Sequence, residues 1–231
     1  MVEGTVNADG KREIDPATLD AHAVYKIMAG CIVPRPIGFI STVDRAGVFN
    51  AAPFSFFNMV SHLPPMISVA IAQNRSGDGP KDTLANILDG GDFVVNVVSE
   101  DIVGAVDLCS EYQPPEIDEI ALSGLTAVTS ARVKSPRIGE SPVSFECSLA
   151  SRVDLEGSLH TLILGRIVHM HIRDDVLLSN GRIDQVRMAA VGRMAGSVYC
   201  RTRDTFETAH DGFAVIERHA NVLSTQAPTG R

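Results

Sequence analysis

Three segments of this chain combine polar side chains with residues that restrict the backbone, and these segments could do chemistry. The first is Val33-Pro34-Arg35-Pro36, which leads into an apolar, β-branched run. The prolines remove backbone donors and stiffen the chain, so Arg35 is held extended and suits bidentate recognition of a phosphate or carboxylate. Ser41 and Thr42 add hydroxyl groups a strand-length further on. A strand start with a solvated arginine explains this segment equally well.

The second segment runs from Asn50 to Asn58 and mixes small polar residues with aromatic ones around Pro53. Small residues let the backbone approach a flat ring, hydroxyl and backbone donors suit ring heteroatoms, and apolar side chains form walls. The mixture therefore favours a site for a planar aromatic ligand, with ordinary core packing as the alternative. In an extended chain Phe54 and Phe56 share a side while Phe57 points away, so these rings are not expected to fill one core face.

The third segment places Asn74-Arg75-Ser76 before Lys81-Asp82-Thr83, with a glycine-rich loop between them. Backbone amides and the positive end of a helix, together with the charge of Lys81, predict an anion site, and the loop at 77–80 could fold over a ligand. The chain has no Walker-type glycine–lysine pattern and no GxGxxG after a strand. Nucleoside triphosphate hydrolysis and a Rossmann dinucleotide site are therefore not indicated.

Strands joined by short turns must position these segments. Apolar, β-branched or alternating runs predict strands at 37–43, 48–52 (stopped by Pro53), 66–72, 93–98, 126–134, 143–149 and 159–172. Two helices are expected between them. One is capped by Asp82 and ended by Gly90-Gly91, and the other is capped by Ser99 and runs to Cys109. Six or seven strands with two inserted helices predict a mainly β fold, a closed or partly closed antiparallel β-barrel.

Shorter helices are expected after Asp15 and after Asp118, and the first residues, 1–24, form a polar extension without clear periodicity. The barrel domain is expected over 25–205, followed by a C-terminal extension at 206–231, and the tail from 218 offers no partner motif.

Composition narrows the function classes. The 231 residues are 45% hydrophobic, which supports a sizeable core, and 20 Lys+Arg against 28 Asp+Glu give a net charge of −8. An acidic chain is poorly suited to bind nucleic acid or anionic membranes. Because apolar runs are short and no secretory signal is visible, the sequence predicts a soluble, cytoplasmic protein.

Cysteine and histidine patterns do not favour a metal site. The four cysteines form no CxxC pair and are expected to be buried, reduced thiols: Cys31, Cys109, Cys147 and Cys200. His169 and His171 share a strand face near His160, but no acidic or thiol partner lies nearby in sequence. Zinc needs three or four converging ligands, so a solvated or interface strand face is the favoured interpretation.

In their order and spacing these segments resemble the flavin reductase-like family of FMN-binding split β-barrels, particularly its flavoredoxin-type branch. The resemblance spans about 25–205 and rests on Arg35-Pro36-Ile37 through Ser41-Thr42, Asn50-Ala51-Ala52-Pro53-Phe54-Ser55, Lys81-Asp82-Thr83-Leu84-Ala85-Asn86-Ile87, Phe93-Val94-Val95-Asn96, Val143-Ser144-Phe145-Glu146-Cys147, Gly165-Arg166-Ile167-Val168 and Gly192-Arg193-Met194-Ala195-Gly196-Ser197-Val198-Tyr199.

The resemblance implies an antiparallel, Greek-key-like barrel and a homodimer with FMN near the subunit interface. It also implies an oxidoreductase that transfers hydride from NADH or NADPH to FMN and passes electrons to a partner monooxygenase or another acceptor. Because hydride moves between two cofactor rings, the protein mainly positions them, and no general acid–base pair is required.

Family positions imply roles for particular residues of this sequence. The phosphate and ribityl chain would be held by Ser41, Thr42, Lys81, Asp82 and Thr83, with Arg35 helping. The isoalloxazine ring would be lined by Ala52, Pro53, Phe54, Ser55 and Phe56. A late segment with Arg193, Ser197 and Tyr199 would approach the flavin or the nicotinamide.

Two other functions stay open. One is an FMN-binding electron carrier with little NAD(P)H turnover. The other is a barrel that binds no flavin and serves as an assembly module. Bleaching of bound flavin by NADH or NADPH distinguishes the enzyme from the carrier, and a colourless purified protein would favour the module.

Overall fold

A computed structural model of the chain describes residues 4–74 and 79–208. Its helices are η1 (Pro16–Thr18), α1 (Ala21–Cys31), α2 (Asp82–Gly90), α3 (Val103–Leu108), α4 (Glu119–Leu122), η2 (Asp174–Val176) and α5 (Gln185–Met188). Its strands are β1 (Gly38–Val43), β2 (Phe49–Phe54), β3 (Phe57–His62), β4 (Pro65–Ala72), β5 (Asp92–Val97), β6 (Ala127–Val128), β7 (Arg137–Ile138), β8 (Val143–Asp154), β9 (His160–Ile172), β10 (Val191–Arg193) and β11 (Tyr199–Arg201). The sequence predictions for Arg75 and Ser76, for the loop at 77–78 and for the tail from 218 lie outside the described residues.

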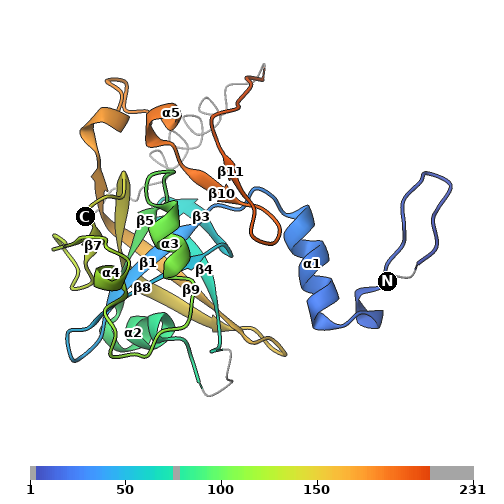
Figure 1. The fold of residues 1–231 in the computed structure, drawn as a ribbon, viewed down its shortest axis with the longest axis horizontal. Helices are drawn as coiled ribbons and strands as arrows, with labels where there is room; N and C mark the ends of the chain where they lie inside the picture. The colour runs from blue at the N-terminus through green and yellow to red at the C-terminus, as the bar shows by residue number, and fades with distance from the viewer. Residues whose placement is uncertain (1–3, 75–78, 209–231) are drawn as a thin grey trace, which may run out of the picture.

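Seven strands form one antiparallel sheet in the order β2-β1-β5-β8-β9-β4-β3 (Figure 1). β2 and β3 stand at opposite ends of this order, yet only Ser55 and Phe56 separate them along the chain. Two residues span only a few ångströms, so the sheet must roll until its two edges come close. The mainly β, antiparallel barrel predicted from the sequence is therefore confirmed.

Two glycines permit close contacts inside this barrel. A Cβ on Gly38 of β1 would lie 3.0 Å from the ring of Phe57, at the start of β3. A Cβ on Gly165 would lie 2.4 Å from Cζ of Phe93, which is fully buried. Glycine is needed at both positions because any side chain would displace a core ring.

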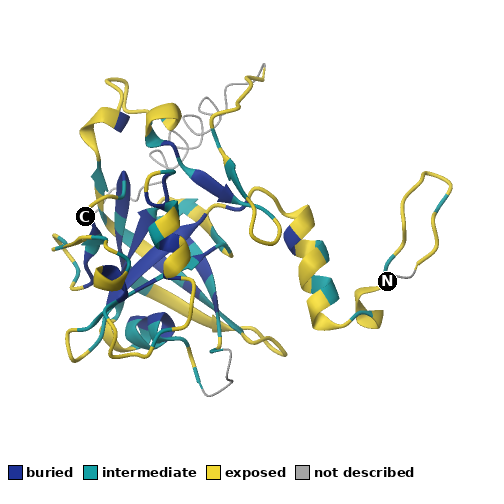
Figure 2. Ribbon diagram, viewed as in Figure 1, coloured by how far each residue is buried: buried dark blue, intermediate teal, exposed yellow. Residues whose placement is uncertain are grey.

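The core has two parts, one on each face of β1. Ile40 belongs to a cluster inside the barrel, which α2 closes with Leu84 and Ile87. Its neighbour Phe39 belongs to a second cluster, which α3 and α4 cover with residues such as Val106. Successive strand residues face opposite sides, so β1 is buried on both faces, as Figure 2 shows for the barrel strands.

The structure differs from the predicted elements near the N-terminus. Helix α1 was not predicted, and Ala29 is its only buried residue. It projects from the barrel together with the N-terminal segment (Figures 1 and 2). Because α1 packs so little against its own chain, its sequence carries no clear apolar stripe.

The segment around Pro53 also departs from prediction. Pro53 continues β2 rather than stopping it, which is tolerated because β2 stands at an end of the sheet order and proline lacks only an N–H. β3 was not predicted. A bend at Ser55–Phe56 interrupts the extended chain, so Phe54 and Phe57 both pack in the barrel while Phe56 is exposed, and the expected pairing of Phe54 with Phe56 on one side is wrong.

Two helix caps and one strand were also predicted wrongly. Lys81, not Asp82, occupies the N-cap of α2, and Ile102, not Ser99, occupies that of α3. The strand expected at 126–134 is reduced to β6. The backbone amides of Ala131 and Arg132 turn instead toward the carboxylate of Glu146.

Candidate functional site

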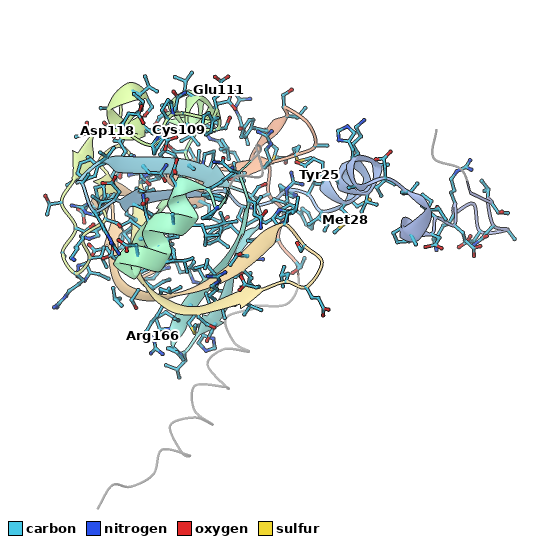
Figure 3. The ribbon with its side chains drawn as sticks, turned by 90° about the horizontal axis from the view of Figure 1, so that it is seen from below. Tyr25, Met28, Cys109, Glu111, Asp118 and Arg166 are labelled. Carbon is cyan, nitrogen blue, oxygen red and sulfur yellow. The ribbon has the colours of Figure 1, made fainter. Side chains whose placement is uncertain are left out.

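A pocket opens beside the N-terminus of α2, and we call it the α2 pocket. β2, the start of α2, the segment 109–113 and Glu119 of α4 form its walls. It brings together five predicted site residues: Ala52, Pro53, Lys81, Asp82 and Thr83. Figure 3 shows Cys109 and Glu111 from this wall, and the neighbouring Asp118, on one side of the barrel.

The N-terminus of α2 is suited to an anion. η1, α1, α4 and α5 begin with an aspartate whose side chain accepts a hydrogen bond from a first-turn amide: Asp15, Asp20, Asp118 and Asp184. α2 begins instead with Lys81, which makes no such cap bond. The Lys81 ammonium lies 5.7 Å from the centre of the Phe54 ring. Uncapped amides and a lysine at a helix start favour a phosphate or carboxylate.

A hydrogen-bonded network forms the inner wall of the α2 pocket. Asn50 donates from Nδ2 to Oε2 of Glu119, and its Oδ1 accepts from Oγ1 of Thr83 at 2.7 Å. The backbone amide of Ala51 also donates to Oε2 of Glu119, at 2.8 Å. Thr42 donates to Oδ1 of Asn50 at 3.3 Å and accepts from Nδ2 of Asn86 at 3.0 Å. The network links three of the pocket's walls.

Glu119 is the titratable group at the centre of this network. Its side chain is nearly buried, and burial raises its pKa from 4.5 to about 7, against the opposing effect of the Ala51 amide. Asp82 and Asp118 raise this pKa further, and Lys81 lowers it. Burial also raises the pKa of Asp82. The pocket therefore holds a carboxyl group that changes charge near neutral pH.

A second pocket, which we call the Arg35 pocket, lies between α1 and the turn from β2 to β3. It is lined by Met28, Ala29, Ile32, Pro34, Arg35, Pro36, Ser55, Phe56, Phe57, Asn58 and Ser68. Arg35 is nearly buried, and its guanidinium donates to the carbonyls of Ala29, Ile32 and Met194 at 2.6–2.9 Å and to Oγ of Ser55 at 3.4 Å. Arg35 thus holds three segments together and lies in a different pocket from Lys81.

The predicted site residues on β1, on β2 and in the turn after β2 do not all face the α2 pocket. Thr42 belongs to the network of the α2 pocket, but Ser41 points to the opposite face of β1, where it donates to the carbonyl of Pro136 and accepts from Asn96. Phe54 is a core residue, whereas Phe56 stacks on His160 with ring centres 5.4 Å apart.

The late segment forms the hairpin of β10 and β11. Arg193 pairs through its backbone with Arg35 in both directions, at 2.9 and 3.0 Å. Its guanidinium lies 4.6 Å from the centre of the Tyr199 ring, and the Tyr199 hydroxyl donates to Asp107. Ser197 is exposed in the hairpin turn. These three residues therefore adjoin the Arg35 side of the molecule.

Sequence reasoning did not select Glu119, Asn50 or Asn86 as site residues. Asn50 begins the segment that is predicted to bind a planar ligand, and Asn86 lies on the helix that is predicted to start at Asp82. Glu119 follows Asp118 in a polar stretch that reads as a surface excursion. The sequence contains no local signal for its burial, because the strand that covers it, β2, lies more than 60 residues away along the chain.

The histidines of β9 and the four cysteines were considered as metal ligands in the sequence. His169 and His171 lie edge to face with ring centres 4.8 Å apart, and His171 bonds to Glu146, an acidic partner that lies across the β8–β9 pair. Within residues 4–74 and 79–208, no three histidine, cysteine or acidic side chains are grouped to hold a metal. All four cysteines are free, and Cys31 is exposed, contrary to the expected burial.

No helix in the described part of the chain combines the length and apolar character needed to cross a membrane.

Comparisons with known proteins agree with this architecture. Residues 28–187 match the model of the flavin reductase like domain. A protein of Aquifex aeolicus, not characterised, is 40% identical over 79% of this chain and 91% of its own length. Component B of nitrilotriacetate monooxygenase from Bacillus cereus is 33% identical, with a TM-score of 0.82 over 86% of this chain and 98% of its own.

Two further structures bear on the fold and its chemistry. The 2-nitrobenzoate 2-nitroreductase of Pseudomonas fluorescens is 30% identical, with a TM-score of 0.78 over 87% of this chain and 97% of its own. Flavoredoxin of Desulfovibrio vulgaris is 23% identical, with a TM-score of 0.68 over 79% and 94%, which supports the fold alone. The resemblance seen in the sequence is confirmed.

Proposed function

Because the chain belongs to the flavin reductase-like family, we propose that it is an FMN-binding oxidoreductase that takes hydride from NADH or NADPH and passes the electrons to an acceptor. One observation carries the proposal: the anion-suited start of α2 lies beside the small residues of β2 in a single pocket. The named activities of two structural neighbours, a monooxygenase component and a nitroreductase, support redox chemistry.

The residues present fit a flavin phosphate. Lys81, Thr83 and the first amides of α2 would hold the phosphate, because this helix start lacks a side-chain cap and carries a positive charge. Ala52, which lines the α2 pocket, is small enough for the backbone of β2 to approach a flat ring.

When bound, the flavin supplies the hydride and electron chemistry, and the protein supplies position and electrostatics. Lys81 and the helix start fix one end of the ligand. Backbone amides of the Ala52–Ser55 stretch, apart from Pro53, which has none, would stabilise negative charge on the ring. The proposed role requires no acid–base pair, because hydride transfer depends on orientation more than on proton transfer.

We propose that a second copy of the chain covers α1 and β3. α1 exposes Tyr25 and Met28 by 55% and 53%, and β3 exposes Met59 by 69% (Figure 3 labels the first two). Met28 also lines the Arg35 pocket, so a partner seated there would close that pocket. Exposed apolar side chains on a projecting helix are typical of an interface between protein chains.

The partner of the proposed reaction is a monooxygenase or another electron acceptor. Component B of nitrilotriacetate monooxygenase is the neighbour that motivates this proposal. An electron carrier with little NAD(P)H turnover is the second candidate, because a flavoredoxin shares the fold.

Anaerobic mixing of the FMN-loaded protein with NADH, and separately with NADPH, tests the function. Bleaching of the flavin's visible absorption, at a rate well above that of free FMN, is the expected result and identifies the donor. Retained FMN that neither nucleotide bleaches would refute the reductase and favour the carrier. A protein that binds no FMN would refute both.

A further inference from the structure

The direction of each hydrogen bond in the α2 pocket follows from the groups present. An ionised carboxylate only accepts, so the side of Asn50 that faces Glu119 must be its NH₂ group. Its carbonyl oxygen then faces Thr42, at 3.3 Å, and Thr83, at 2.7 Å, and the Thr83 hydroxyl gives its single proton to Asn50. While Glu119 is ionised, Thr83 therefore meets any ligand in the pocket as an acceptor only.

An acceptor at Thr83 is unfavourable for a phosphate, because the phosphate oxygens also only accept hydrogen bonds. A protonated Glu119 changes the arrangement, because its OH can donate to the carbonyl oxygen of Asn50 once that amide has turned over. The NH₂ group of Asn50 then donates to Thr83, and the Thr83 proton becomes available to the ligand. The Ala51 amide continues to donate to the carboxyl group in both arrangements.

We infer that Glu119 is a positioning residue that couples binding of a phosphate group in the α2 pocket to the uptake of one proton, through Asn50 and Thr83. The inference rests on the proposed function, since FMN is the phosphate-bearing ligand. The proton comes from solvent and remains on the Glu119 carboxyl, and no covalent bond changes.

Other charged and titratable groups surround Glu119. Lys81 and Asp82 face it from α2, Asp118 precedes it on α4, and the Sγ of Cys109 lies 3.7 Å from its backbone oxygen. Further groups on the walls of this pocket and the adjoining one are Glu111, Tyr112 and Asp44. Burial opposes ionisation of Glu119 most strongly, and Asp82 and Asp118 oppose it further, so its protonated form is accessible near neutral pH.

Calorimetry in two buffers with different ionisation enthalpies measures the proton exchange directly. At pH 7 we expect FMN binding to take up about half a proton, because Glu119 is then about half protonated before binding. Riboflavin, which lacks the phosphate, is expected to bind without proton uptake. The phosphate of FMN has a second pKa of about 6 and contributes little at this pH.

Glu119→Gln is the first variant, since glutamine is neutral at every pH and can donate to Asn50. We expect no proton uptake, and an FMN affinity that does not change between pH 6 and 8 apart from the titration of the ligand. The wild-type affinity is expected to fall about 10-fold over the same range. Glu111→Gln is the matched control for removal of a pocket carboxylate, and it should keep the proton uptake.

Thr83→Val distinguishes coupling through the Asn50 and Thr83 hydrogen bonds from simple charge repulsion between Glu119 and the phosphate. Valine has the shape of threonine without the hydroxyl, so FMN binding should weaken and lose its proton uptake although Glu119 is intact. If proton uptake persists in Thr83→Val, repulsion between Glu119 and the phosphate explains it, and coupling through Asn50 and Thr83 is wrong.

A failure of this inference can be distinguished from a failure of the proposed function. FMN binding with equal proton exchange in the wild type and Glu119→Gln would overturn this inference and leave the proposed function standing. Absence of flavin binding at any pH would overturn both.

Discussion

Two glutamates of this barrel, Glu146 and Glu119, are buried but differ in the hydrogen bonds that their carboxylates accept. Glu146 is fully buried on β8, accepts from the amides of Ala131 and Arg132 at 2.7 and 2.6 Å, and bonds to His171. Glu119 is 7% exposed on α4, its carboxylate accepts from the Asn50 side chain and the Ala51 amide, and it lines the α2 pocket.

The two pKa values differ accordingly. Burial alone would raise the pKa of Glu146, but hydrogen bonds from the Ala131 amide, His171 and the Arg132 amide outweigh it and hold that pKa below its usual value. Burial dominates at Glu119 and raises its pKa to about 7. A carboxylate that anchors a loop is fully paired, whereas one that faces a binding pocket remains able to change charge.

The largest expected effect is on stability, from Glu146→Ala. The substitution removes the buried carboxylate that accepts from two backbone amides and bonds to His171, so we expect the free energy of unfolding to fall by about 3–4 kcal/mol. Urea denaturation monitored by circular dichroism measures it. A loss below about 1 kcal/mol would mean that Glu146 does not anchor the segment before β7.

The pH dependence of stability should have opposite signs at the two glutamates. The folded pKa of Glu119 is raised, so its stabilising contribution is present below the unfolded value of 4.5 and is lost as the pH rises through 7. Relative to Glu119→Gln, the wild type should lose about 3 kcal/mol of unfolding free energy between pH 4.5 and 7.5.

The folded pKa of Glu146 is lowered, so its contribution is present above 4.5 and is lost as the pH falls through the folded value. Relative to Glu146→Gln, the wild type should therefore gain stability as the pH rises from acid. Chemical denaturation at a series of pH values checks both slopes, and slopes of the same sign would remove the distinction between the two sites.

A smaller effect is expected from His171→Ala. Glu146 keeps its two backbone donors in this variant, and the His171 side chain is only partly buried. We expect a loss of about 1 kcal/mol in unfolding free energy. A loss as large as that of Glu146→Ala would show that the histidine, not the backbone amides, holds the carboxylate.

The barrel could be predicted because its strands carry their own pattern. The apolar run of β5 and the alternation at the start of β8 identify buried strands without knowledge of their partners. α1 could not be predicted, because its apolar residues Tyr25 and Met28 are more than half exposed. The pattern that identifies a helix comes from the core that it covers.

The candidate site was only partly predictable for a related reason. Lys81 and Thr83 were identified because a helix start is visible in sequence, and the α2 pocket contains both. Ser41 looked equivalent to Thr42, but alternation along β1 sends its side chain to the opposite face. Glu119 becomes a site residue only through contacts with β2 that local sequence does not encode.

The most direct test is a titration of FMN and riboflavin into wild-type protein, Lys81→Ala and the control Lys134→Ala, whose lysine is exposed away from the pocket. If the α2 pocket binds the flavin phosphate, Lys81→Ala weakens FMN binding by about 1–2 kcal/mol and leaves riboflavin binding unchanged. Lys134→Ala should match the wild type for both ligands. Undiminished FMN affinity in Lys81→Ala would contradict the placement of the flavin phosphate in the α2 pocket.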